Sequence, residues 1–176
     1  VGLSPGTNKF LDTFKAPFKS QKLDSSRFEL AYADDLPSSL ERSIGGAHLI
    51  DAQSNPFQKD LFFRGYSSSP LLGVAQGLSI FLGSTRLNEP LGQEINWDMI
   101  PISAVSNLTL ISGATPLFGL NSLGGALSLE LKTGFSFEET KIDLNTGSWG
   151  RHTANIEHGY NNGRTGYYVN LSYKEE

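Results

Sequence analysis

The sequence predicts an α+β fold that ends in a run of antiparallel strands. Residues 34–45 have the spacing of a short helix, and residues 100–134 contain two strands separated by a glycine-rich loop. After Gly134 the pattern changes to an alternation of apolar and polar residues, which is typical of strands with two different faces. Glycine supplies 19 of the 176 residues, which favours turns and β structure over long helices.

The predicted helix at residues 34–45 carries both start and stop signals. An aspartate precedes it, Pro37 suits its first turn, and a pair of glycines can end it. Its apolar residues are four positions apart and therefore share one face, namely Leu36, Leu40 and Ile44. We expect a short strand at residues 48–51 and an apolar strand ending at Phe63 to follow it.

Residues 1–33 have a mixed character. Phe10, Phe14 and Phe18 have the spacing of an amphipathic helix, but Pro17 interrupts that pattern. We therefore expect a surface segment with a few aromatic anchors rather than a helix.

Residues 100–134 predict a strand, a loop and a second strand. The first strand covers residues 105–111, and the second covers residues 126–132, with alternating leucines on one side. Between them lie glycines, which accept positive φ angles and close backbone contacts. The pattern alone is that of an ordinary soluble α+β domain.

Three further strands are expected after Gly134, at residues 140–146, 151–160 and 167–173. Each places apolar residues on one face and polar residues on the other, and tight-turn residues separate them. Aromatic residues near the strand ends suit the wall of a transmembrane barrel. A soluble antiparallel meander would have a similar pattern, so the residues alone leave both alternatives open.

Composition excludes several functional classes. The net charge is −4 without any Lys/Arg cluster, so we expect no nucleic-acid partner. Cysteine is absent, which excludes disulfides and thiol nucleophiles. His152 and His158 lie six residues apart on one strand, too far apart to chelate one metal ion. We expect no catalytic set, no metal site and no cofactor.

No apolar run approaches the roughly 18 residues that a transmembrane helix needs. The first residues also lack the basic start and apolar core of a signal peptide, so we expect a mature form or a fragment.

The motifs of residues 34–134 occur in a distinctive order. They are Phe-Arg-Gly-Tyr at 63–66, an apolar strand at 78–82, connections at 86–90 and 96–101, the strand at 105–111, Leu-Phe-Gly at 117–119, Gly-Gly-Ala-Leu at 124–127 and Leu-Lys-Thr-Gly at 131–134. Together they resemble the plug domain of TonB-dependent outer-membrane receptors. One departure is Gly-Ser-Thr at 83–85, where many members carry Asp-Gly-Val. It leaves the fold unaffected but removes an aspartate that could contact ligand.

The resemblance implies two domains. Residues 1–134 would be the plug domain, with a small mixed β-sheet, short helices and long loops. Residues 135–176 would be the first antiparallel strands of the outer-membrane β-barrel. A plugged barrel has about 22 strands, so we expect an incomplete, truncated barrel.

The resemblance also implies a function in the bacterial outer membrane, with the N-terminal side of the plug in the periplasm. The plug would occlude the pore and help to recognise a scarce nutrient such as a metal-siderophore complex. Expected partners are an inner-membrane energy-transducing TonB-type protein, the remainder of the barrel, outer-membrane lipid beyond Gly134, and the small-molecule ligand. The alternative is a soluble periplasmic or surface β-rich binding module without transport activity.

By the same resemblance, specific residues have expected roles. Arg64 would anchor the plug to carboxylates of the barrel wall, although a plain surface arginine would have the same pattern. Predicted ligand contacts lie in two loops and are Ser68, Ser69, Leu72, Asn96 and Trp97, although Trp97 is also suited to packing under its own loop. The glycines expected to be structural are Gly65, Gly113, Gly119, Gly124 and Gly125.

Overall fold

The computed structural model describes residues 2–3, 10–11, 19–30, 35–51, 55, 58–114 and 118–175. The chain divides into two compact units. The mixed-sheet unit comprises Val1–Ile102 and Asn107–Glu130, and the meander unit comprises Ser103–Ser106 and Leu131–Glu176. The prediction of a boundary at residue 134 stays a prediction, but Gly134 itself lies inside the meander unit.

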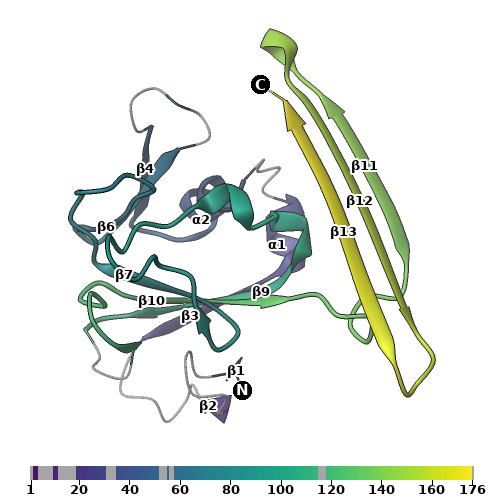
Figure 1. Ribbon diagram of the computed structural model, residues 1–176, viewed down its shortest axis with the longest axis horizontal. Coiled ribbons are helices and arrows are strands. Elements are labelled where there is room, and N and C mark those ends of the chain that lie inside the picture. Colours follow the sequence, from purple (N-terminus) through teal and green to yellow (C-terminus); the bar gives the residue numbers. More distant parts are fainter. Residues whose placement is uncertain are drawn as a thin grey trace. The chain divides into compact units, whose positions relative to one another are not determined.

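The elements follow one another along the chain as Figure 1 shows. They are β1 Gly2–Leu3, β2 Phe10–Leu11, β3 Ser20–Asp24, α1 Ser25–Leu30, α2 Leu36–Ser43, β4 Ala47–Asp51, β5 Lys59–Phe63, β6 Tyr66–Ser68, β7 Leu78–Leu82, β8 Thr85–Arg86, η2 Trp97–Met99, η3 Ile102–Ala104, β9 Val105–Ser112, β10 Gly125–Leu131, β11 Thr140–Thr146, η5 Ser148–Gly150, β12 His152–Asn161 and β13 Gly166–Glu175. In the described part of the chain, no helix is long and apolar enough to cross a membrane.

The largest sheet of the mixed-sheet unit has the strand order β3-β9-β10-β7-β8. Strands β7 and β10 are parallel, with Leu78 opposite Gly125, whereas β3 pairs with β9 and β7 with β8 in antiparallel fashion. The expected small mixed sheet is therefore confirmed. Because β7 and β10 are parallel, the loops that precede them reach the same end of the sheet.

Strands β4, β5 and β6 form a second, antiparallel sheet. Phe63 and Tyr66 pair directly, so Arg64 and Gly65 are the two central residues of the β5–β6 turn. Both have positive φ angles, 51° and 84°. This combination is typical of the type I′ turn, whose twist matches that of the flanking strands.

Helix α2 begins at an aspartate, as the sequence predicts. The Asp35 carboxylate accepts a hydrogen bond from the Ser38 backbone N–H at 2.7 Å, and Lys59 Nζ lies 2.7 Å from its other oxygen. Burial alone would raise the pKa of Asp35, but the hydrogen bonds from Lys59 and Ser38 outweigh it and lower the pKa overall. The helix start is thus joined to β5 by a charged contact.

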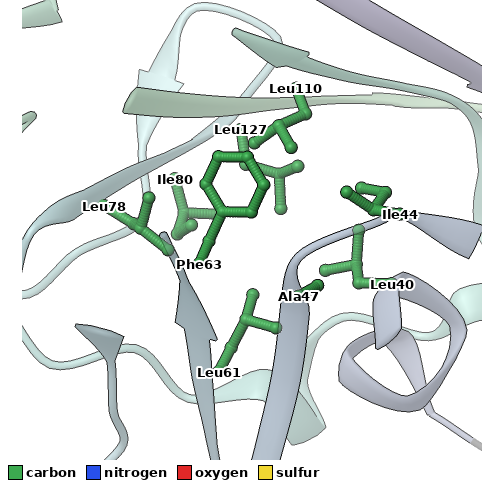
Figure 2. Close-up of a pocket in the computed structure, with 9 residues that line it drawn as sticks. All are labelled: Leu40, Ile44, Ala47, Leu61, Phe63, Leu78, Ile80, Leu110 and Leu127. Atoms are coloured by element: carbon green, nitrogen blue, oxygen red, sulfur yellow. The ribbon is translucent and has the colours of Figure 1, made fainter. Parts of the chain in front are cut away.

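The core of the mixed-sheet unit lies between α2, the β4–β5 hairpin and one face of the mixed sheet. Figure 2 shows the nine side chains that meet there, all of them apolar: Leu40, Ile44, Ala47, Leu61, Phe63, Leu78, Ile80, Leu110 and Leu127. They enclose a cavity of about 10 Å³, which is no larger than the space of one water molecule and lacks polar lining. The cavity is therefore a packing gap and not a ligand site.

The other face of the mixed sheet is also covered. Phe81, Ile111, Phe118 and Ala126 form a buried cluster, with the Phe81 and Phe118 rings 6.3 Å apart. Strand β10 is consequently buried on both faces over most of its length, whereas its alternating leucines predict one buried face. The small residues between the leucines permit the second layer to approach.

Two elements of the mixed-sheet unit are not evident from the sequence. Strand β3 pairs with β9 from Ser20 opposite Ile111 to Asp24 opposite Asn107, and α1 follows it directly. Of the aromatic anchors expected in this region, Phe10 lies in strand β2, while Phe14 and Phe18 lie outside the described residues. Strand β3 has only one buried side chain, Leu23, so it lacks the apolar pattern that would predict it.

In the meander unit, β11, β12 and β13 form an antiparallel sheet, so the three predicted strands are confirmed. Ile142, Ile156 and Leu171 face one another across the three strands. All three are exposed, together with the other large apolar side chains of the same face: Leu144, Tyr160, Tyr167, Val169 and Tyr173. The strands are seen at the green-to-yellow end of the chain in Figure 1.

Replacing Asp35 with alanine should lower the free energy of unfolding by about 1 kcal/mol, the usual cost of losing an N-cap. Urea unfolding followed by circular dichroism measures the change. Asp35→Asn should lose less, because asparagine also caps helices. The matched control is Asp51→Ala at the exposed end of β4, which should change stability by less than about 0.5 kcal/mol. Equal losses for the two alanine variants would contradict the capping role.

Candidate functional site

Three loops of the mixed-sheet unit meet at the end of the sheet where β7 and β10 begin. We call residues 69–77, 87–96 and 118–124 the loop cluster. The Ile95 N–H donates to the Ser69 carbonyl at 3.0 Å, and the Gly124 N–H donates to the Gly77 carbonyl at 2.8 Å. The cluster thus brings together segments that are far apart in the sequence, including both of the loops predicted to contact ligand.

Arg86, at the end of β8, joins two of these loops. Its Nη2 donates to Gln93 Oε1 at 2.6 Å and to the Leu120 carbonyl at 2.7 Å, and Nε lies 3.4 Å from Asn88 Oδ1. Partial burial lowers the pKa of Arg86, but a guanidinium stays charged at neutral pH. All these acceptors are neutral oxygens, so the positive charge is not neutralised by them. The sequence shows no signal for this role.

Asn88 supports the same junction from inside the fold. Its Oδ1 accepts a hydrogen bond from the Ile80 backbone N–H at 2.7 Å, and its Nδ2 donates to the carbonyls of Leu78 and Gln93. The side chain therefore satisfies backbone groups of β7 that no neighbouring strand reaches. It fixes the start of residues 87–96 against the sheet.

The predicted ligand contacts divide into buried and exposed residues. Ser68 and Ser69 are fully buried, and the Ser69 hydroxyl accepts a hydrogen bond from the Leu71 N–H. Trp97 is only 4% exposed and packs into the unit, the alternative that its sequence pattern left open. Leu72 and Asn96 are exposed. Ligand contact stays a prediction, and only the last two side chains are open to it in this structure.

The loop cluster contains several exposed leucines. Leu91 is 100% exposed and Leu120 is 82% exposed, and Leu72 and Leu123 are also exposed. A Cβ atom on Gly92 would lie 2.6 Å from Leu72 Cδ1, which places Leu72 beside the loop of residues 87–96. Several exposed apolar side chains gathered on one set of loops are typical of an interaction surface. Sequence reasoning identified Leu72 alone among them.

The predicted structural glycines occupy positions where a side chain would be costly. A Cβ on Gly125 would lie 2.1 Å from the Ile111 carbonyl oxygen, and one on Gly124 would lie 2.6 Å from Tyr66 Cβ. Gly65, Gly113 and Gly119 have positive φ angles. The glycines therefore shape the β9–β10 and β5–β6 contacts below the loop cluster.

Arg64 lies at the surface in the β5–β6 turn. Its guanidinium carbon is 5.2 Å from the centre of the Phe63 ring, and it forms no ion pair with any described carboxylate. The predicted anchoring role of Arg64 thus stays a prediction about groups outside these residues.

The polar face of the meander unit contains a network of buried charges. Glu157 Oε2 lies 2.7 Å from Lys132 Nζ and accepts a hydrogen bond from the Tyr168 hydroxyl at 2.8 Å. Glu157 is 1% exposed, although it belongs to a sheet whose opposite face exposes aliphatic and aromatic side chains. The sheet is therefore polar on its buried side and apolar on its exposed side, the reverse of a sheet in a water-soluble protein.

The two histidines of β12 belong to the exposed apolar face. His152 contacts Thr146, and His158 contacts both Thr140 and Tyr167 through hydrogen bonds. No cluster of metal-ligating side chains occurs among the residues that the structure describes.

Comparison with known proteins yields matches among solved structures only. No protein-family model matches the sequence, and no curated protein matches it either. The ferric yersiniabactin uptake receptor FyuA from Yersinia pestis matches with a TM-score of 0.63 at 12% identity, covering 84% of this chain and 22% of that chain. The ferripyoverdine receptor of the outer membrane of Pseudomonas aeruginosa matches with a TM-score of 0.63 at 14% identity, covering 96% and 22%. The copper transporter OprC matches with a TM-score of 0.55 at 21% identity, covering 80% and 21%.

These matches show a shared fold. The chain spans about a fifth of the length of the solved structures that it matches. The resemblance to TonB-dependent receptors is therefore confirmed at the level of the fold, and the neighbours are receptors and a transporter rather than enzymes.

Replacing Arg86 with alanine should lower the free energy of unfolding by about 1–2 kcal/mol. Hydrogen bonds to a charged group contribute about 1.5–3 kcal/mol, and the half-buried position of Arg86 reduces that value. Arg86→Lys should not restore stability, because an ammonium group cannot reproduce the planar guanidinium donors. Urea unfolding measures both variants against Arg64→Ala, an exposed arginine that should change little. Full stability of Arg86→Ala would exclude this bridging role.

Proposed function

We propose that this chain is the plug, together with the first barrel strands, of a TonB-dependent outer-membrane receptor. The fold that it shares with receptors and a transporter supports this assignment. The single observation that carries it is the reversed polarity of the β11–β13 sheet, which exposes its apolar face and buries Glu157 on the other.

The exposed apolar face has the dimensions and composition of a lipid-facing barrel wall. Aliphatic side chains such as Leu171 lie between Tyr160 and Tyr167 at one end and Tyr173 at the other. Strands β12 and β13 have ten residues each, and a β-strand tilted by about 45° needs about 9–11 residues to span a membrane. Outer-membrane barrels have an apolar band about 25 Å tall between two aromatic girdles. A soluble binding module would instead turn this face toward its core.

In this proposal the mixed-sheet unit occludes the pore, and its loop cluster faces the ligand. The exposed leucines offer apolar contact, and Arg86 supplies a positive charge that the loops hold in place. A scarce nutrient such as a metal-siderophore complex is the proposed ligand class. One neighbour is named for ferric yersiniabactin uptake, one for ferripyoverdine and one for copper, so a metal occurs in all three names. An inner-membrane TonB-type protein would supply the energy for release.

Labelling of single cysteines in the full-length receptor tests the barrel wall. The chain has no cysteine, so each introduced thiol in these residues reports its own environment. Leu171→Cys should react with a lipid-soluble maleimide and not with a charged, water-soluble one, because its side chain faces lipid. Ser172→Cys, the next residue on the opposite face, should show the reverse preference. Equal reaction of both cysteines with the water-soluble reagent would refute the barrel-wall assignment.

Deletion of residues 1–130 from the full-length receptor tests the occluding role. Without the mixed-sheet unit the barrel should be open, and cells should become sensitive to vancomycin, a bulky antibiotic that the outer membrane excludes. The amount of receptor in the outer membrane, measured by immunoblot, provides the control. Unchanged resistance with a normal amount of receptor would show that this unit does not close the pore.

A further inference from the structure

A barrel wall does not need the ion pair that the meander unit buries. Lumen-facing residues of a barrel can be polar and solvated, so a barrel strand gains nothing from a charge hidden from water. Yet the side chains of Lys132 and Glu157 are only 8% and 1% exposed, with Nζ and Oε2 2.7 Å apart. A buried ion pair costs desolvation energy, and one role known for such pairs is to enforce a specific geometry.

The ion pair joins a segment outside the strands to the sheet. Lys132 belongs to residues 132–139, which connect β10 to β11, whereas Glu157 lies in the middle of β12. Lys132 Nζ also lies 4.6 Å from the centre of the Phe137 ring, and that ring contacts Tyr168 edge-on at 5.6 Å. Tyr168 in turn donates to Glu157, so the four side chains form a closed set of contacts.

Backbone contacts hold the same segment closely against the sheet. The Gly159 N–H donates to the Glu139 carbonyl at 3.0 Å, and a Cβ on Gly159 would lie 1.8 Å from the Phe137 carbonyl oxygen. Likewise, a Cβ on Gly134 would lie 2.4 Å from the Tyr160 carbonyl oxygen. Glycines at these positions permit an approach that any other residue would prevent.

A second segment is held on the same polar face. Ser103 Oγ donates to Asn155 Oδ1 at 3.0 Å and accepts from Asn170 Nδ2 at 3.0 Å. The Lys132 N–H donates to the Ala104 carbonyl at 2.8 Å, and Asn155 Nδ2 donates to Glu157 Oε1 at 3.3 Å. Residues 103–106 and 132–139 therefore share one network with Glu157 at its centre.

The chain passes between the two units three times, after Ile102, after Ser106 and after Glu130. Each of these passages leads directly into or out of a segment that the network holds. We propose that Glu157 is a positioning residue for pore occlusion: with Lys132 it fixes the chain that carries the plug onto the inner face of the barrel wall. The proposal rests on the proposed function, and it concerns how the plug is seated rather than how it binds ligand.

The test measures leakage through the full-length receptor, per receptor molecule, with vancomycin as the probe. Glu157→Gln removes the charge that Lys132 needs and should loosen the seating of the plug. Vancomycin entry should rise at least about tenfold, since loss of one member of a buried charge pair is strongly destabilising. The double variant Lys132→Glu with Glu157→Lys exchanges the two charges. Its vancomycin entry should return to within about threefold of the wild type, because the ion pair is re-formed.

Asp143→Asn is the matched control. Asp143 lies on the same polar face and pairs with Lys141 at 3.6 Å, but both side chains are substantially exposed. Exposed ion pairs contribute little, so this variant should leave vancomycin entry unchanged. If Glu157 had a merely structural role, Glu157→Gln would reduce the amount of assembled receptor without causing leakage. The charge exchange would then not restore the amount of receptor.

Unchanged entry in Glu157→Gln, with a normal amount of receptor, would overturn the proposal. Leakage that the charge exchange fails to reduce would overturn it as well. If Glu157→Gln does not reach the membrane, the same measurement is made on Lys132→Met. This variant removes the other member of the ion pair, which lies outside the sheet, and the same criteria apply. Deletion of residues 1–130 separates the two hypotheses. If cells with the deletion variant stay resistant to vancomycin, pore occlusion itself is rejected. If the deletion variant leaks and Glu157→Gln does not, only the positioning role of Glu157 is rejected.

Discussion

The reversed polarity of the β11–β13 sheet is the constraint on which the interpretation of this chain depends. In water, a sheet places its apolar face against a core and its polar face toward solvent. Here Ile142, Ile156 and Leu171 face outward, and Glu157 is hidden. A sheet of this kind is stable where lipid or further protein covers the apolar side. Every polar group on the inner side then has to be solvated or satisfied by the protein, as the Lys132–Glu157–Tyr168 network does.

The mixed-sheet unit depends on a different constraint, the parallel pairing of β7 with β10. Parallel strands begin at the same end of a sheet, so the loops before Leu78 and Gly125 must meet. Strand β8 runs back antiparallel and delivers residues 87–96 to the same place. The loop cluster is therefore a product of topology, and Arg86 holds two of its members through hydrogen bonds that no local pattern predicts.

Local signals made much of the fold predictable. The aspartate cap and Pro37 of α2 and the alternation in β11–β13 act over a few residues, where propensity and periodicity dominate. Strand β3 was not predictable, because it is held by pairing with β9 and has only Leu23 buried. The double burial of β10 was missed for a related reason: a second layer of side chains covers its small residues.

In the candidate site, too, some features follow from local residue patterns and others only from tertiary packing. Local residue patterns determine where α2 begins, where most of the strands lie, and which face of the last three strands is apolar. Only the packing of distant segments shows that Ser68 and Ser69 are buried while Leu91 and Leu120 are exposed. It also decided that Lys132 meets Glu157, since contacts across 25 positions depend on how the chain returns upon itself. Short-range preferences are written into neighbouring residues, whereas burial and charge pairing arise only when distant segments pack together.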